Sequence, residues 1–225
     1  MWSVPAKNMK KINIITGHYG SGKTTIALNT ALRLAQNNKK VSIVDLDIVN
    51  PYFRTSDFPE LLKKNSIEMI APMYAGSNLD IPAVNFDMER IISESSHVVI
   101  DVGGDDAGAY ALGRYAPLID SMKEQTDMLY VINCYRYLTK TPAEAVQLMY
   151  EIEQAARIKH TGIINNSSLG YETSAEEIEK SHEFAVKISE ETGLPLVFTA
   201  YRKGIDINIS PKTEVELFVK PLWDK

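Results

Sequence analysis

The sequence "GHYGSGKTT", residues 17–25, decides the fold class of this chain. It fits the pattern G-x-x-x-x-G-K-[ST] at every fixed position, with a β-rich run before it and apolar residues at helical spacing after it. Glycines let backbone N–H groups turn inward around a phosphate, and the start of the following helix adds partial positive charge. The stretch predicts a phosphate-binding loop formed by Gly17, His18, Tyr19, Gly20, Ser21, Gly22, Lys23, Thr24 and Thr25.

The last three residues of this loop have predictable roles. Lys23 can bridge the β- and γ-phosphates, the Thr24 hydroxyl can hold Mg²⁺, and Thr25 can reach the α-phosphate. Glycine loops between a strand and a helix also occur without a phosphate, but Gly-Lys-Thr in this context favours a nucleotide. We therefore expect a nucleotide and Mg²⁺ as ligands.

Apolar runs of strand length alternate with helical patterns along the whole chain. This alternation predicts an α/β fold: a single P-loop NTPase domain over residues 1–225, with a mostly parallel sheet of about seven strands and helices on both faces. Residues 1–10 are expected to form an N-terminal tail and residues 213–225 a C-terminal extension. The predicted strands are 11–16, 40–47, 67–72, 97–104, 127–135, 160–167 and 194–201, and the predicted helices are 24–38, 82–96, 141–158 and 174–193.

Carboxylates stand at the ends of two further predicted strands. In "VDLDIVNPYFR", Asp45 and Asp47 are two residues apart, so on a regular strand one could face the metal while the other orients the loop. In "VVIDVGGDDAG", Asp101 ends an apolar run and is expected to reach the Mg²⁺ shell through water. The glycines after it predict a loop that moves with the γ-phosphate and carries Asp105 and Asp106. For each acid the alternative is a helix cap or a solvated turn.

With these motifs, the chain resembles the MinD/ParA/nitrogenase iron protein group of P-loop ATPases, the CobQ/CobB/MinD/ParA nucleotide-binding family. "VDLDIVNPYFR" is similar to the second-strand motif of MinD, which implies that Asp47 positions the attacking water and that Asp45 is its partner near Lys23 and the metal. "DVGGDDAG" is similar to the switch region of the nitrogenase iron protein, which implies that Asp101 and Asp105 are its two aspartates.

The resemblance runs from about residue 11 to residue 201 and extends to the nucleotide base. "GIINNS" is similar to the adenine-contacting strand end of the iron protein, which implies that Asn166 binds the adenine amide. The strand end "FTAYR" is expected to supply further base contacts through Thr199, Tyr201 and their neighbours. The guanine-reading pattern N/T-K-x-D is missing, since "LTKTP" has no aspartate, so ATP/ADP is preferred over GTP.

The chain departs from this group at three positions. His18 stands where dimeric members have a signature lysine that reaches the partner's nucleotide; it could do this when protonated or could simply be a loop residue. Tyr19 replaces a glycine, and its larger side chain affects how closely the phosphate loops of two subunits can approach each other. Gly108 stands where the iron protein has its cluster-binding cysteine, and Cys134 is expected inside an apolar strand as a small core residue. We therefore expect no iron–sulfur cluster.

Composition excludes several further classes of function. The formal net charge is −5, the pI is about 5.5 and no Lys/Arg-rich run occurs, so we expect no nucleic-acid partner. The single cysteine excludes an internal disulfide and fits a reducing compartment. No apolar run has the length of a signal peptide or a membrane span, so we expect a cytoplasmic protein with no membrane partner.

Two main hypotheses of function remain from the sequence. The first is an ATP-dependent switch or accessory ATPase, slow without its partner, that acts on an unknown client protein and forms a nucleotide-dependent homodimer. The second is a small-molecule ligase or kinase of the same superfold, similar to dethiobiotin synthetase, with a pocket built by "PYFRTSDFPELLKK" and "MYAGSNLDIP" and an anion site at Arg54 or Arg114. A nucleotide-bound scaffold that does not hydrolyse is a further alternative.

Overall fold

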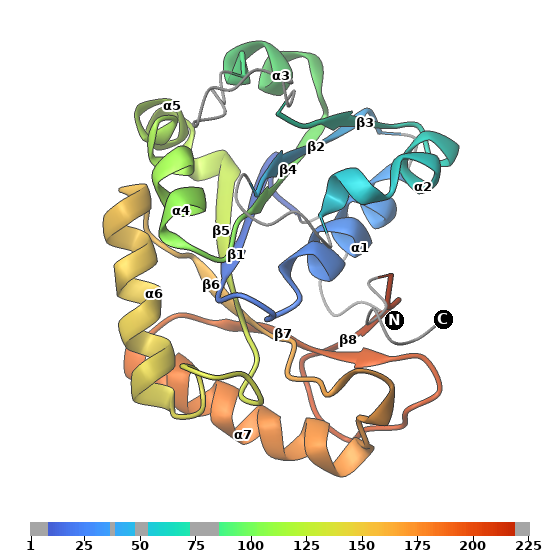
Figure 1. Cartoon of the computed structure of the whole chain (residues 1–225), viewed down its shortest axis with the longest axis vertical. Helices are drawn as coiled ribbons and strands as arrows, with labels where there is room; N and C mark the ends of the chain where they lie inside the picture. Colours follow the sequence, from blue (N-terminus) through green and yellow to red (C-terminus); the bar gives the residue numbers. More distant parts are fainter. Residues whose placement is uncertain (1–8, 37–38, 48–53, 73–85, 219–225) are drawn as a thin grey trace, which may run out of the picture.

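The centre of the molecule is an all-parallel, eight-stranded sheet (Figure 1). The computed structural model describes residues 9–36, 39–47, 54–72 and 86–218. Within these residues the strands follow the order β3-β2-β4-β1-β5-β6-β7-β8 across the sheet. Their bounds are β1 Ile12–Gly17, β2 Val41–Leu46, β3 Ile67–Ile70, β4 His97–Val102, β5 Thr126–Ile132, β6 Gly162–Asn165, β7 Leu196–Arg202 and β8 Lys212–Val215.

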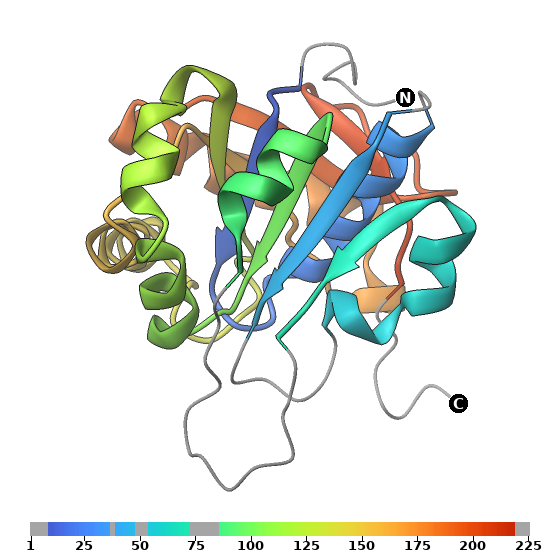
Figure 2. The ribbon, with the colours of Figure 1, turned by 90° about the horizontal axis from the view of Figure 1, so that it is seen from above.

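The strand order reverses around β1, which lies between β4 and β5. The chain moves outward from β1 to β2 and β3, returns to β4, and then passes to β5 on the other side of β1. Ligands of such sheets bind outside the carboxyl ends of the strands, where the order reverses. All strands run the same way, as the arrows of β2, β3 and β4 show in Figure 2, so their carboxyl ends share one edge.

The helices begin and end where local sequence signals place them. The two longest, α6 and α7, each start with a capping box, Thr141 with Glu144 and Ser174 with Glu177, and Gly193 ends α7 in the left-handed conformation. Their bounds, with those of the other α-helices, are α1 Lys23–Ala35, α2 Pro59–Lys64, α3 Met88–Glu94, α4 Asp106–Gly113, α5 Ala116–Ser121, α6 Pro142–Ala156 and α7 Ala175–Thr192.

Helices cover both faces of the sheet, as predicted (Figure 1). One face packs against α1 and α2, in a core that includes Ile26, Leu34 and Leu62. The other face packs against α3 to α7, in two clusters that include Ile92, Leu112, Met149 and Ile188. Because β1, β4 and β5 are buried on both faces, their ends hold the site residues rigidly.

The structure adds elements that the sequence pattern did not predict. The sheet has an eighth strand, β8, in which residue 213 lies, so the segment expected to be an extension from that residue begins within the sheet. The segment after β4, expected to be a mobile loop, contains α4 and α5. The prediction for Cys134 is wrong: it follows the end of β5 and is half-buried. Part of the helix predicted over 82–96 lies outside the described residues; α3 starts at Met88.

Candidate functional site

The phosphate loop joins β1 to α1 and needs glycine at defined positions. Gly17 has φ +145°, and a Cβ there would lie 2.2 Å from the carbonyl oxygen of Val131. Gly22 caps α1 with φ +87°, and a Cβ there would lie 2.1 Å from Nδ2 of Asn166. Side chains are therefore excluded at both ends of the loop, by Val131 at the end of β5 and by Asn166 just after β6.

Lys23 is buried at the start of α1, where its ammonium faces the loop. Its Nζ donates a hydrogen bond to the carbonyl oxygen of His18 at 3.1 Å. Burial lowers the pKa of Lys23, and the nearby carboxylates of Asp101, Asp47 and Asp105 act in the opposite direction. The structure thus brings together the lysine and three of the predicted acids.

Thr24 and Asp101 form the part of the site that fits a divalent cation. The Thr24 hydroxyl donates to Oδ2 of Asp101 at 2.9 Å, whereas the buried Oδ1 of Asp101 has no hydrogen-bond partner among the described residues. Burial, together with the charge of Asp45, raises the pKa of Asp101 to about 8. An orphaned carboxylate oxygen beside a threonine hydroxyl is the oxygen-rich environment that Mg²⁺ prefers.

Asp45, in β2, and Asp47, which follows this strand, have different positions. Asp45 accepts hydrogen bonds from the backbone amides of Asp47 (2.9 Å) and Ser56 (3.2 Å), one on each carboxylate oxygen, and burial raises its pKa. Both of its oxygens thus hold the loop after β2, so the assignment of Asp45 as a metal ligand is not supported by this geometry. Asp47 instead lines, together with Lys23, a cavity that opens from the phosphate loop.

The segment from Gly103 to Asp105 lies against both Asp47 and the phosphate loop. A Cβ on Gly103 would lie 3.2 Å from Oδ1 of Asp47. A Cβ on Gly104 would lie 2.7 Å from Nζ of Lys23 and 2.7 Å from the backbone nitrogen of Tyr19. Asp105 is the N-cap of α4: its Oδ1 accepts from the amide of Gly108 at 3.0 Å. The helix-cap alternative for Asp105 therefore holds in this structure.

A cavity of about 590 Å³ opens from the phosphate loop toward the ends of β6, β7 and β8. Asn166 lines it and donates from Nδ2 to the carbonyl oxygen of Ser21 at 2.8 Å, so its amide joins the end of β6 to the phosphate loop. Tyr201 and Arg202 also line it. Thr199 does not line the cavity. It is buried and hydrogen-bonds Asn165 and His182, whereas its neighbour Ala200 lines the cavity. The assignment of Thr199 as a base contact is not supported.

The far end of this cavity is mainly apolar. Its lining there includes Leu169, Ile178, Ile205, Val215 and Leu217. Among the described lining residues Asp47 is the single carboxylate, and it lies at the phosphate end. In "NSSL", residues 166–169, leucine stands where the N-K-x-D pattern has its guanine-reading aspartate. The sequence alone pointed to "LTKTP" for this pattern. The hydrogen bond from Asn166 to Ser21 instead indicates "NSSL", because it brings the end of β6 to the phosphate loop.

His18 and Tyr19, the two unusual loop residues, are oriented differently. His18 is half-buried; burial, and then the charge of Lys23, lower its pKa below 6.5, so its imidazole is neutral near pH 7. Tyr19 is 60% exposed and lines the mouth of the cavity. A neutral imidazole is a poor replacement for a lysine that pairs with a phosphate, which favours the loop-residue reading of His18.

Residues after β5 belong to the site although the sequence did not single them out. Asn133 and Arg136 line the cavity, and Nε of Arg136 donates to the carbonyl oxygen of Gly20 at 3.0 Å. The position of "NCYR" directly after a strand adjacent to β1 was the available signal, since the carboxyl ends of such strands face the ligand.

A series of buried, hydrogen-bonded side chains supports the end of β1, where the phosphate loop begins. The hydroxyl of Thr16, which precedes Gly17, hydrogen-bonds Nε2 of His160 at 2.8 Å. Glu153 accepts from the backbone amide of His160 at 2.9 Å and pairs with Lys159. Burial acts to raise the pKa of Glu153, but the hydrogen bonds from His160 and Lys159 dominate and bring it to about 2.

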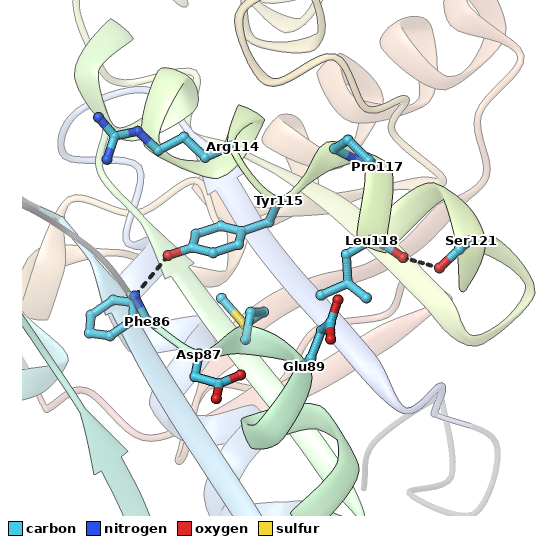
Figure 3. A pocket seen from close by; sticks show the side chains of 9 residues that line it. Phe86, Asp87, Glu89, Arg114, Tyr115, Pro117, Leu118 and Ser121 are labelled. Carbon is cyan, nitrogen blue, oxygen red and sulfur yellow. Dashed lines mark hydrogen bonds between the residues drawn. The ribbon is translucent and has the colours of Figure 1, made fainter.

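A second, more open cavity of about 570 Å³ lies between the start of α3 and the α4–α5 junction (Figure 3). There the hydroxyl of Tyr115 accepts from the backbone amide of Phe86 at 3.1 Å. Arg114 lines the cavity, but its guanidinium extends away from Tyr115 and Leu118. Arg54, the other predicted anion site, is buried before the short 3₁₀ helix η2, Thr55–Asp57. Residues 51–53 and 73–82 of the two predicted pocket segments lie outside the described residues.

No helix within the described residues is both long enough and apolar enough to span a membrane. In the same ranges no group of three or more His, Cys, Asp or Glu side chains forms a ready-made metal site, so a cation at Asp101 would need ligands from a nucleotide or water.

Known proteins match this chain in part. Residues 7–100, less than half of the chain, match the ParA family, described as NUBPL iron-transfer P-loop NTPase. The tyrosine-protein kinase YwqD of Bacillus subtilis is 35% identical over 83 residues, which is 33% of this chain and 35% of that protein. The signal recognition particle 54 kDa protein of Sulfolobus acidocaldarius is 28% identical over 129 residues, which is 56% of this chain and 27% of that protein.

Solved structures extend the likeness to most of the fold. Chloroplast FtsY from Physcomitrella patens superposes with a TM-score of 0.58 at 16% identity, over 85% of this chain and 58% of that one. FtsY from Mycoplasma mycoides gives a TM-score of 0.57 at 20% identity, over 84% and 59%. At this identity the likeness shows the fold alone. Together with the geometry of the phosphate loop, it shows the fold of a P-loop NTPase, and the similarity to the ParA family is over residues 7–100.

Proposed function

We propose that this protein binds Mg-ATP, hydrolyses it slowly, and uses the nucleotide state to control a client protein in the cytoplasm. The single observation that carries the proposal is the contact of Gly104 with Lys23 and Tyr19. A γ-phosphate bound by Lys23 has to share this space with the segment from Gly103 to Asp105. Binding of that phosphate therefore moves the segment, and with it the start of α4 at Asp106.

The nucleotide proposed is ATP rather than GTP. Guanine is read by a carboxylate that accepts from its ring N–H and amino groups, and the described base end of the cavity has Leu169 at that position. A mainly apolar end of the cavity, with the amide of Asn166 beside it, suits adenine. The Mg²⁺ ion would be held by Thr24, by Asp101 through water and by the nucleotide, and would supply Lewis-acid stabilisation of the phosphates. Asp47 is proposed to position the attacking water.

The proposed partners are a client protein and, in the ATP state, a second copy of this chain. Tyr19 is exposed at the mouth of the cavity, which makes it available to such a partner. The neutral His18 does not supply the cation that a trans-acting lysine would. The iron transfer named for the matched family is not proposed here, because these 225 residues contain one cysteine and therefore no cysteine pair.

The small-molecule ligase or kinase is the second candidate, and the cavity beside Tyr115 is the observation that favours it. Its distance from the phosphate site argues against it. Arg114 follows α4, whose eight residues span roughly 12 Å from Asp105, which is too far for a direct phosphoryl transfer. A substrate in this cavity would also find the Arg114 guanidinium turned away (Figure 3).

Equilibrium binding of Mg-ATP, measured by titration calorimetry with GTP as competitor, tests the proposal. We expect the wild type to bind ATP more tightly than GTP, and Lys23→Ala to abolish binding of both. Lys39→Ala is the matched control, since Lys39 lies outside the cavity and should leave binding unchanged. Retained tight Mg-ATP binding by Lys23→Ala would contradict the site assignment, and a preference for GTP would contradict the base assignment.

A further inference from the structure

Arg136 is a residue outside the known motifs whose side chain contacts the phosphate loop. It belongs to the loop between β5 and α6, 116 residues from Gly20 in sequence, and its Nε donates to the carbonyl oxygen of Gly20 at 3.0 Å. Gly20 has φ +74°, and a Cβ there would lie 3.3 Å from the same Nε. Arg136 therefore packs directly on the loop that surrounds the phosphates, and it lines the same cavity as Lys23.

The backbone of Arg136 is fixed by buried polar neighbours. Its amide donates to the carbonyl oxygen of Asn133 at 3.2 Å, and its own carbonyl oxygen accepts from the amide of Thr139 at 3.3 Å. Asn133 and Thr139 are both almost fully buried, and Nδ2 of Asn133 bonds the carbonyl oxygen of Ser168 at 3.2 Å. Arg136 is exposed, but its backbone is held by these contacts and its Nε by Gly20, so it loses less conformational entropy on binding a ligand than an arginine on a free loop would.

At the phosphate end of the cavity, negatively charged side chains outnumber Lys23, so a second cation would help to bind a polyphosphate. Lys23 faces the carboxylates of Asp101, Asp47 and Asp105, and burial keeps His18 neutral near pH 7. Among the ion pairs of the described residues, none joins Arg136 to a carboxylate. A guanidinium has five N–H donors, of which the contact with Gly20 uses one.

We infer that Arg136 binds the polyphosphate of the nucleotide in cis, as a second phosphate-binding cation beside Lys23 in the same cavity. The inference rests on the proposed function, because it assigns a residue to the same nucleotide site. Arginine suits this role since its planar fork pairs with phosphate oxygens through two parallel hydrogen bonds and keeps its charge at every physiological pH.

Displacement of a fluorescent ATP analogue by ATP, ADP and AMP tests this assignment, with Arg136→Ala, Arg136→Gln and Arg136→Lys compared with the wild type. We expect Arg136→Ala and Arg136→Gln to weaken ATP binding about ten- to hundred-fold, the range of a charge-assisted hydrogen bond. AMP binding should change less than about threefold, and Arg136→Lys should recover part of the loss for ATP. Arg90→Ala is the control, because Arg90 is exposed on α3 and pairs with Glu94.

A thermal melt of each nucleotide-free variant separates phosphate binding from support of the loop. An equal loss of ATP and AMP affinity, together with a lower melting temperature, would show that Arg136 only holds Gly20 in place, and would overturn the inference. Unchanged ATP affinity in Arg136→Ala, with normal binding by the wild type, would overturn it while leaving the proposed function intact. A wild type that binds none of the three nucleotides would overturn both.

Discussion

Substitution of Gly104 by alanine tests the proposed link between the phosphate site and α4. The added methyl group would lie 2.7 Å from Nζ of Lys23, 2.7 Å from the nitrogen of Tyr19 and 2.8 Å from its Cα. Two of these atoms are backbone of the phosphate loop, so they cannot rotate away, and the segment from Gly103 to Asp105 has to move instead. We expect Gly104→Ala to retain ADP binding within about threefold and to lose ATP hydrolysis by about tenfold or more, ~1.4 kcal/mol in the barrier.

The same substitution should lower stability by an amount typical of overpacking. That cost is about 1–3 kcal/mol. Each kcal/mol lowers the melting temperature of a chain of this size by about 2–4 °C, which gives about 2–12 °C in total. Steady-state phosphate release and differential scanning calorimetry measure the two effects.

Gly103→Ala is the matched comparison for Gly104→Ala. A methyl group on Gly103 would meet Oδ1 of Asp47 at 3.2 Å and Oδ1 of Asp105 at 3.3 Å, both of them side-chain atoms that can shift by a few tenths of an ångström. Its effect on stability should therefore be smaller. If Gly104→Ala has the melting temperature and the ATP hydrolysis rate of the wild type, the close packing of this segment on the phosphate loop affects neither stability nor hydrolysis. The proposed link between the phosphate site and α4 is then wrong.

Three further predictions test separate parts of the site. Asp47→Ala should keep Mg-ATP binding and lower single-turnover hydrolysis about a hundredfold or more; unchanged turnover would assign the water-positioning role to another residue. Leu169→Asp should raise GTP affinity relative to ATP by about tenfold, with Leu169→Asn as the neutral control; an unchanged nucleotide ratio in competition binding would refute the position assigned to the base. The lowered pKa of Glu153 stabilises the folded state above its ordinary value of 4.5, and this contribution is lost as the pH falls toward about 2. In urea titrations, the free energy of unfolding of the wild type should therefore fall more steeply than that of Glu153→Gln across this range, and parallel curves would contradict the proposed support by His160.

Sequence pattern predicted the centre of the sheet because β1, β2, β4 and β5 are mainly apolar runs that are buried on both faces. The elements it missed are short or weakly patterned. The strand β8 has four residues, in which the charged Lys212 and Glu214 alternate with its two buried positions, Thr213 and Val215. The helix α4, "DAGAYALG", contains two glycines, which lower helix propensity and favoured a loop. Packing against α6 and β4 stabilises α4, and such tertiary contacts cannot be read from local propensity.

The site was predictable where a motif fixes the chemistry and less so where orientation decides. The loop residues, Lys23, Thr24 and Asp101 lie where their motifs indicate. Asp45 could have faced the cation or the loop, and its two backbone contacts decide for the loop. Thr199 and Ala200 are adjacent on β7, so their side chains point to opposite faces, and only Ala200 reaches the cavity. Arg136 has no motif, and only its contact with Gly20 reveals it.

In the proposed switch, the segment between β4 and α4 senses the γ-phosphate. Hydrogen–deuterium exchange of residues 102–113 tests this role, measured on the nucleotide-free protein, with Mg-ADP and with a slowly hydrolysed Mg-ATP analogue. We expect the ATP analogue to change protection of the backbone amides from Gly103 to Ala109, and ADP, which binds the same loop, to leave their protection unchanged. Equal exchange of this segment with both nucleotides, at concentrations that saturate the site, would contradict it.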